Sequence, residues 1–192
     1  DMYWDMGPEW YKGRLAKGNV ANKRIVGEKT PELIYVDHCA ERMKQICPDA
    51  KFILCLRDPV KRAYSNWNMQ LPSGSGVEDL SFQGAIDREL NELMGEKRVY
   101  STALYHYLQR GFYMDQIERF LKVFPDRSKL LIVVAEHMRT NPDKIYKEVF
   151  EFVGASDFTL EAEDEHIGSY GSKMSERMKE KLTNIYASHN ER

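Results

Sequence analysis

Two short apolar runs interrupt an otherwise amphipathic chain. Residues 51–56 read Lys-Phe-Ile-Leu-Cys-Leu, and residues 129–135 read Lys-Leu-Leu-Ile-Val-Val-Ala. Each run has the length of a strand and is continuously apolar instead of alternating with polar residues. This pattern is typical of strands that are buried on both faces of a parallel sheet.

Helical signals fill the segments around these two runs. Asp58 and Pro59 are a favoured cap and a favoured first helical residue, so we expect a helix from there to about Gln70. Asp37 is the expected N-cap of a helix over 37–47. Further helices are predicted over 78–94, over 99–124 with a break near Gly111, over 142–153 and over about 175–188.

Strands that are separated by helices indicate an α/β layered sheet. The Pro-Ser-Gly-Ser-Gly stretch at 72–76 is expected to be a loop, and 155–173 is expected to be irregular. The chain has 192 residues and shows no internal repeat or long linker. We therefore expect residues 1–192 to form a single domain.

Composition excludes several classes of protein. Hydrophobic residues make up 42% of the chain, and 28 Lys+Arg against 30 Asp+Glu give a net charge of −2. Such a chain is unlike a disordered one, and it lacks the basic excess of a general nucleic-acid binder, so no nucleic-acid partner is expected. No apolar run is long enough to span a membrane. These exclusions leave room for a local cationic pocket that binds a small anion.

The three cysteines are expected to be reduced, buried thiols. Cys39 and Cys47 bracket a predicted helix at ~12 Å, which is too far for a disulfide, and no zinc-type spacing is present. No metal site is expected. The absence of a signal peptide, sequons and disulfides favours the cytoplasm. A Golgi-type lumen is the alternative if an N-terminal anchor precedes Asp1.

The segment from Lys51 to Asn68 contains residues that are suited to binding an anion. In open α/β sheets, ligands bind beyond the carboxyl ends of the strands, and Arg57 stands at such an end. The N–H groups of the first turn of the following helix would be available to an anion, and Ser65 adds a hydroxyl about two turns later. Arginine binds phosphate through two parallel charge-assisted hydrogen bonds. The alternative is that Arg57 and Asp58 simply pair with each other or cap the helix.

Several motifs occur in a recognisable order along the chain. They are Trp10-Tyr11, Gly27-Glu28-Lys29-Thr30-Pro31, Leu56-Arg57-Asp58-Pro59, Arg62-Ala63-Tyr64-Ser65, Arg110-Gly111-Phe112-Tyr113 and Phe124-Pro125. Together they resemble the heparan-sulfate-type branch of the sulfotransferases that use 3′-phosphoadenosine 5′-phosphosulfate (PAPS), both the N- and the 3-O-sulfotransferase kind. The resemblance covers nearly the whole chain. It implies a three-layer fold related to P-loop kinases, with a mostly parallel sheet flanked by helices.

The resemblance also implies roles for individual residues. Arg57 and Ser65 match the residues that hold the 3′-phosphate of the donor. Lys29 matches a lysine near the transferred sulfonyl group, where it would stabilise developing negative charge; the alternative is a surface lysine. Arg62 is expected to be structural, as a partner of Asp58 one helical turn away.

Two departures from the family pattern stand out. The loop that holds the 5′-phosphosulfate is not found, and neither is the glutamate that often serves as general base, so the fold is expected to be incomplete at its N-terminus. The C-terminal cofactor loop, basic in the family, corresponds here to 167–173. Gly168, Ser169, Tyr170 and Lys173 are the candidate contacts in this loop, with an ordinary flexible loop as the alternative.

The expected reaction is transfer of a sulfonyl group from PAPS to a hydroxyl or amine of a carbohydrate or other small acceptor, with PAP as the second product. A chain that only binds PAP or PAPS is one alternative. A nucleotide or small-molecule kinase is another, although neither a P-loop nor Mg²⁺ ligands are seen. The sequence gives no indication of the acceptor's identity or of an oligomeric state.

Overall fold

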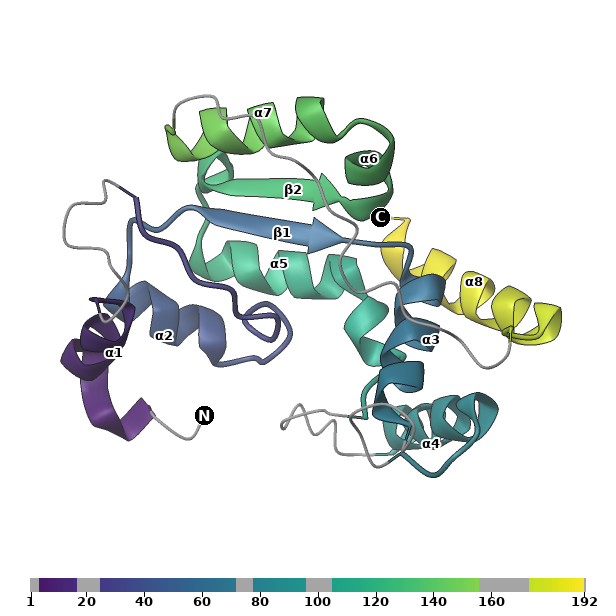
Figure 1. Cartoon of the computed structure of the whole chain (residues 1–192). Helices are drawn as coiled ribbons and strands as arrows, with labels where there is room; N and C mark the ends of the chain where they lie inside the picture. Colours follow the sequence, from purple (N-terminus) through teal and green to yellow (C-terminus); the bar gives the residue numbers. More distant parts are fainter. Residues whose placement is uncertain (1–3, 17–24, 72–77, 96–104, 156–172, 192) are drawn as a thin grey trace.

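The computed structural model describes residues 4–16, 25–71, 78–95, 105–155 and 173–191 (Figure 1). The N-terminal elements are η1 (Trp4–Met6), α1 (Gly7–Ala16) and α2 (Cys39–Ile46). Then follow β1 (Phe52–Leu56), α3 (Pro59–Gln70), α4 (Phe82–Met94), η2 (Gln109–Gly111) and α5 (Tyr113–Val123). The last are η3 (Arg127–Lys129), β2 (Leu130–Val134), α6 (Ala135–Thr140), α7 (Pro142–Val153) and α8 (Glu176–Asn190).

The sheet confirms both predicted strands. In the described residues β1 and β2 pair in parallel, from Phe52 opposite Leu130 to Leu56 opposite Val134. Figure 1 shows α5 beside β1 and α7 beside β2, while α2 packs on α5 and α6 follows the end of β2. The α/β architecture is therefore as expected, and the carboxyl ends of both strands meet at one edge.

The expectation that both strands are buried on both faces is wrong for part of the sheet. Phe52 packs on α5, with its ring 4.8 Å from that of Phe120 and 4.6 Å from that of Phe124. Ile53 and Ile132, in contrast, remain 41% and 43% exposed. Ile53 shares a face of the sheet with Leu131, and Ile132 shares the opposite face with Leu54, so the described helices leave part of each face uncovered.

Helix α3 begins and ends where the sequence predicts. The Asp58 carboxylate accepts a hydrogen bond from the Lys61 N–H at 3.0 Å, and Pro59 is the first helical residue. Val60, Ala63 and Trp67 are buried in a core that also includes residues of α4 and α8. This packing fixes α3, and with it the end of β1, against the rest of the molecule.

Three predicted helix details are wrong. The helix predicted over 78–94 begins only at Phe82, because the Ser81 side chain caps it by accepting the Gly84 N–H. Helix α2 begins at Cys39 after an N-cap at His38, while Asp37 forms an ion pair with Arg119 at 2.8 Å instead of capping the helix. The described part of the predicted 99–124 helix is a turn over 105–108 followed by η2 and α5. Hydrogen bonds to a buried carboxylate, described below, hold this turn in place of helical bonds.

The C-terminal helices agree with the predictions. Pro142 starts α7, and Gly154 ends it in the left-handed conformation at φ +78°. Ser175 caps α8, whose Met178 and Leu182 are buried. The expected loop at 72–76 and most of 155–173 lie outside the described residues. Cys39 and Cys47 are free and half-buried, whereas Cys55 is free and exposed, so the expectation of a buried thiol is wrong there.

Candidate functional site at the carboxyl ends of the strands

Arg57 occupies the place that the sequence predicts. It follows the last residue of β1 directly, and Asp58 and Pro59 then begin α3. On the neighbouring strand, α6 begins directly after Val134. The side chains of Arg57 and Ser65 are both half-buried. The structure thus places Arg57 at the edge where ligands of open α/β sheets bind.

Ser65 lies on the face of α3 that continues from this edge. Residues 58, 61 and 65 are spaced by three and four positions, so they share one helical face, and helical side chains lean toward the N-terminus. The Ser65 hydroxyl therefore leans toward the end of β1.

The first turn of α3 offers fewer backbone donors than the sequence analysis expects. Pro59 has no N–H, and the Lys61 N–H is already bound to Asp58 at 3.0 Å. The Arg62 N–H donates to the Asp58 carbonyl at 2.9 Å. At most the N–H of Val60 remains, so an anion here depends mainly on side-chain donors.

Lys29 lies close to the same end of β1. Burial raises the pKa of the Cys55 thiol, and the positive charge of Lys29 opposes that rise. Cys55 and Arg57 are two positions apart along an extended chain, so both point to one side. Lys29 itself is exposed. The structure thus brings Lys29 to the half of β1 that leads into Arg57.

The segment that follows Lys29 is tied to η2 and α5. Arg110 forms an ion pair with Glu32 at 2.6 Å. Arg119 donates to the carbonyls of Ile34 and Tyr35 at 3.0 and 2.6 Å. These contacts hold residues 32–35, which follow Lys29, against η2 and α5.

A histidine also contacts this segment. The Tyr35 hydroxyl lies 2.5 Å from Nδ1 of His106, and Nε2 of His106 lies 3.6 Å from Glu92. Burial lowers the pKa of His106. Burial thus favours the neutral imidazole, in which one ring nitrogen is a hydrogen-bond acceptor.

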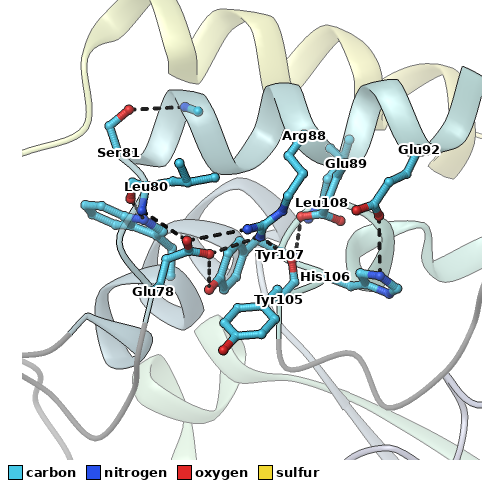
Figure 2. Close-up of polar contacts among 12 residues, drawn as sticks. Glu78, Leu80, Ser81, Arg88, Glu89, Glu92, Tyr105, His106, Tyr107 and Leu108 are labelled. Atoms are coloured by element: carbon cyan, nitrogen blue, oxygen red, sulfur yellow. Dashed lines mark hydrogen bonds and ion pairs between the residues drawn. The ribbon is translucent and has the colours of Figure 1, made fainter.

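Two buried glutamates hold the turn that leads to η2 (Figure 2). Glu78 pairs with Arg88 at 3.0 Å and accepts a hydrogen bond from the Tyr107 hydroxyl at 2.9 Å. Glu89 accepts from three consecutive backbone N–H groups, those of Tyr107, Leu108 and Gln109, at 2.5, 2.8 and 3.1 Å. A buried carboxylate thus replaces the helical acceptors of this segment.

The two glutamates titrate differently. Burial raises the pKa of Glu89 to about 7, although its backbone donors oppose the rise. Burial also acts to raise the pKa of Glu78, but its hydrogen-bond donors outweigh burial and hold the pKa below the ordinary value. Glu89 is consequently the group in this network that takes up a proton near neutral pH.

Arg62 is structural, as expected, but with a different partner. Its guanidinium donates to the Tyr107 carbonyl instead of pairing with Asp58. Asp58 is left to Lys61, whose Nζ lies 4.0 Å away. The reason is that Arg62 points inward toward the turn over 105–108, where its charge favours the ionised form of Glu89.

The predicted C-terminal loop is described only in small part. Gly168, Ser169 and Tyr170 lie outside the described residues, and Lys173 is exposed just before α8. The opposite end of α8 reaches η2, where Asn190 donates to the Gly111 carbonyl at 2.8 Å. Lys173 is therefore about 22 Å of helix away from that contact.

Sequence reasoning missed two residues at the end of β1. The Tyr113 hydroxyl donates to the Arg57 carbonyl at 2.9 Å, and Oε1 of Glu136 accepts the Asp58 N–H at 3.1 Å. For Glu136 a signal was present, because it follows the second apolar run and the carboxyl ends of parallel strands meet. For Tyr113, nothing in the spacing indicates which carbonyl it contacts.

The described residues contain no group of three or more His, Cys, Asp or Glu that could hold a metal ion. Nor does any helix among them combine the length and apolarity that crossing a membrane requires. The chemistry available at this site is that of Arg57, Ser65 and Lys29, which are all hydrogen-bond donors suited to anions.

Comparison with known proteins shows which family the chain resembles. The chain is 30% identical over 152 residues to the bifunctional heparan sulfate N-deacetylase/N-sulfotransferase 3 of Mus musculus, covering 78% of this chain and 17% of the relative. It is 27% identical over 161 residues to the human heparan sulfate glucosamine 3-O-sulfotransferase 3B1, covering 80% and 37%. The chain thus spans well under half the length of these relatives.

A solved structure agrees with these relatives. The crystal structure of a sulfotransferase from Alicyclobacillus acidocaldarius superposes with a TM-score of 0.73 at 26% identity, over 94% of this chain and 67% of that one. Residues 9–191 match the sulfotransferase domain family. The predicted resemblance is confirmed, including its heparan-sulfate type, and the chain belongs to the sulfotransferase family.

Proposed function

We propose that this protein transfers a sulfonyl group from PAPS to a hydroxyl or amine of a carbohydrate acceptor. The observation that carries the proposal is the position of Arg57 at the carboxyl end of β1, with Ser65 on the adjoining face of α3. In a member of the sulfotransferase family, this pair fits the 3′-phosphate of the donor.

The residues present fit such a phosphate chemically. A guanidinium stays charged at any physiological pH and matches a phosphate with two parallel hydrogen bonds. A serine hydroxyl adds a neutral donor. The Asp58 carboxylate accepts a hydrogen bond from the Lys61 N–H and lies 4.0 Å from the Lys61 Nζ. These contacts direct it toward Lys61.

Lys29 is the residue that we assign to the transfer step. PAPS supplies the sulfonyl group, and the Lys29 ammonium stabilises the negative charge that develops during transfer. Its exposure and its effect on Cys55 support this role, since an exposed cation near the end of β1 is accessible to a bound ligand. Gly168, Ser169, Tyr170 and Lys173 remain proposed donor contacts.

The names of the relatives support the acceptor class that we propose. Both mammalian relatives are named as heparan sulfate sulfotransferases, one acting on N and one on 3-O positions. A carbohydrate hydroxyl or amine is accordingly the acceptor that we propose, with heparan-like oligosaccharides as the first compounds to assay.

Titration of the chain with PAP, followed by calorimetry, tests the donor site. We expect Arg57→Ala to weaken PAP binding by about 10-fold or more, because a charge-assisted pair is lost. Arg127→Ala, at an exposed position in η3, is the matched control and should bind as the unmodified chain does. Normal PAP binding by Arg57→Ala would refute the site.

A transfer assay with labelled PAPS separates an enzyme from a protein that only binds the nucleotide. Label appearing on the oligosaccharide supports transfer, whereas PAP binding without any labelled product supports the binding-only alternative. Equal affinity for ATP and PAP would contradict a site built for the 3′-phosphate.

A further inference from the structure

The peptide unit that joins Arg57 to Asp58 is held at both of its poles. Its carbonyl accepts a hydrogen bond from the Tyr113 hydroxyl at 2.9 Å. Its N–H donates to Oε1 of Glu136 at 3.1 Å. Two side chains from different parts of the fold therefore grip one peptide plane.

The two gripping residues come from elements on either side of the strand. Tyr113 is the first residue of α5, and Glu136 lies in the first turn of α6, directly after β2. Both side chains are half-buried. Burial raises the pKa of the Tyr113 phenol, so its hydroxyl keeps the proton that it donates.

The two hydrogen bonds together fix the orientation of the whole Arg57–Asp58 peptide plane. A peptide unit is planar, so setting the directions of its C=O and N–H sets the plane as a whole. That plane determines ψ of Arg57 and φ of Asp58, which is −41°. It thereby sets where the Arg57 side chain leaves the backbone and how α3 continues toward Ser65.

We propose that Tyr113 and Glu136 are positioning residues of the 3′-phosphate site, acting through the Arg57–Asp58 peptide unit. The inference rests on the proposed function, since it assigns these contacts to the placement of a phosphate-binding arginine. Neither side chain is required to touch the ligand.

The Glu136 side chain can be tested separately as a hydrogen-bond acceptor and as a negative charge. A negative charge beside a phosphate site opposes phosphate binding, so its presence needs a compensating role. Accepting the Asp58 N–H is such a role, and it requires an oxygen acceptor but not a charge. Glu136→Gln keeps an amide oxygen and removes the charge, whereas Glu136→Ala removes both.

Three variants of the full chain test the roles: Tyr113→Phe, Glu136→Ala and Glu136→Gln. The readout is the ratio of the affinities for PAP and for AMP, which lacks the 3′-phosphate. We expect Tyr113→Phe and Glu136→Ala to lower this ratio by about two- to ten-fold, the usual effect of one hydrogen bond. Glu136→Gln should keep the ratio or raise it.

The ratio distinguishes positioning from general destabilisation, because a loosened fold weakens both nucleotides alike. Matched controls on α7 are Tyr146→Phe and Glu151→Ala, which should leave the ratio unchanged. A second readout needs no ligand: hydrogen exchange of the Asp58 amide should become faster in Glu136→Ala and stay slow in Glu136→Gln.

The outcomes also separate the two proposals. If the unmodified chain shows no preference for PAP over AMP, the proposed function fails and this inference falls with it. If that preference exists and depends on Arg57, but Tyr113→Phe and Glu136→Ala leave it unchanged, only the positioning role is refuted. Unchanged exchange of the Asp58 amide in Glu136→Ala would refute the role of Glu136.

Discussion

Gly111 lies directly against the ring of Tyr186. A Cβ added at Gly111 would come within 2.5 Å of Cε1 and 2.8 Å of the hydroxyl oxygen of that tyrosine. The ring is 3% exposed, and its hydroxyl donates to the Leu108 carbonyl at 3.0 Å, so it has little freedom to move. Only glycine fits at this contact between η2 and α8.

Gly111→Ala is therefore expected to destabilise the protein. Overpacking of this kind costs about 1–3 kcal/mol of the free energy of unfolding, which urea denaturation measures. Gly13→Ala is the control, because a Cβ there meets nothing within 4 Å and alanine favours the helix. Equal stability of the two variants would contradict the tight contact.

Glu89 gives a pH-dependent prediction. Its pKa is about 7 in the folded protein, raised by burial above the ordinary value of 4.5. Between these values the folded state holds a proton that the unfolded chain releases, so this group's contribution to stability falls as pH rises. We expect the stability of the unmodified chain relative to Glu89→Gln to decline from about pH 4.5 to about pH 7. Denaturation curves at several pH values would test this decline, and a constant difference would argue against it.

Lys29→Ala should separate transfer from binding. Loss of a cation that acts on developing charge is expected to lower the transfer rate by about 100-fold or more, while PAP affinity changes by less than about threefold. Lys144→Ala, on an exposed part of α7, is the matched control. The comparison needs kcat from the labelled-PAPS assay and Kd from calorimetry. A parallel loss of both quantities would instead place Lys29 in donor binding.

Arg119 and Asp37 form an ion pair, and we expect Arg119 to contribute more than Asp37 to the free energy of unfolding. Arg119→Ala removes hydrogen bonds to the carbonyls of Ile34 and Tyr35 as well as the pair, and we expect it to cost about 1.5–3 kcal/mol. Asp37→Ala removes only one partner at an exposed position and should cost about 0–1 kcal/mol. Thermal or urea unfolding of both variants provides the test; similar losses would show that the carbonyl contacts matter little.

Local sequence signals predicted the parts of the fold that depend on local physics. Asp58 and Pro59 fix the start of α3 because capping and the fixed φ of proline act within one turn. The two apolar runs became β1 and β2 for a similar reason, since each has the length and composition of a strand. The position of Arg57 at the end of β1 followed directly from these elements.

Interactions between distant segments could not be predicted in the same way. Aspartate is a favoured N-cap residue, but the Asp37 carboxylate forms an ion pair with Arg119 of α5 instead. The turn at 105–108 replaces a predicted helix because Glu89 accepts its N–H groups across the chain. Such long-range partners are visible only once the elements are packed.

The peptide between Arg57 and Asp58 has a consequence for the order of folding. Its two partners are 56 and 78 positions away in sequence, so two long loops must close before its orientation is set. The helix beside it needs only neighbours to form. We therefore expect the Arg57–Asp58 peptide unit to reach its final orientation late in folding, when these distant contacts form. Helix α3 is expected to be helical before that step.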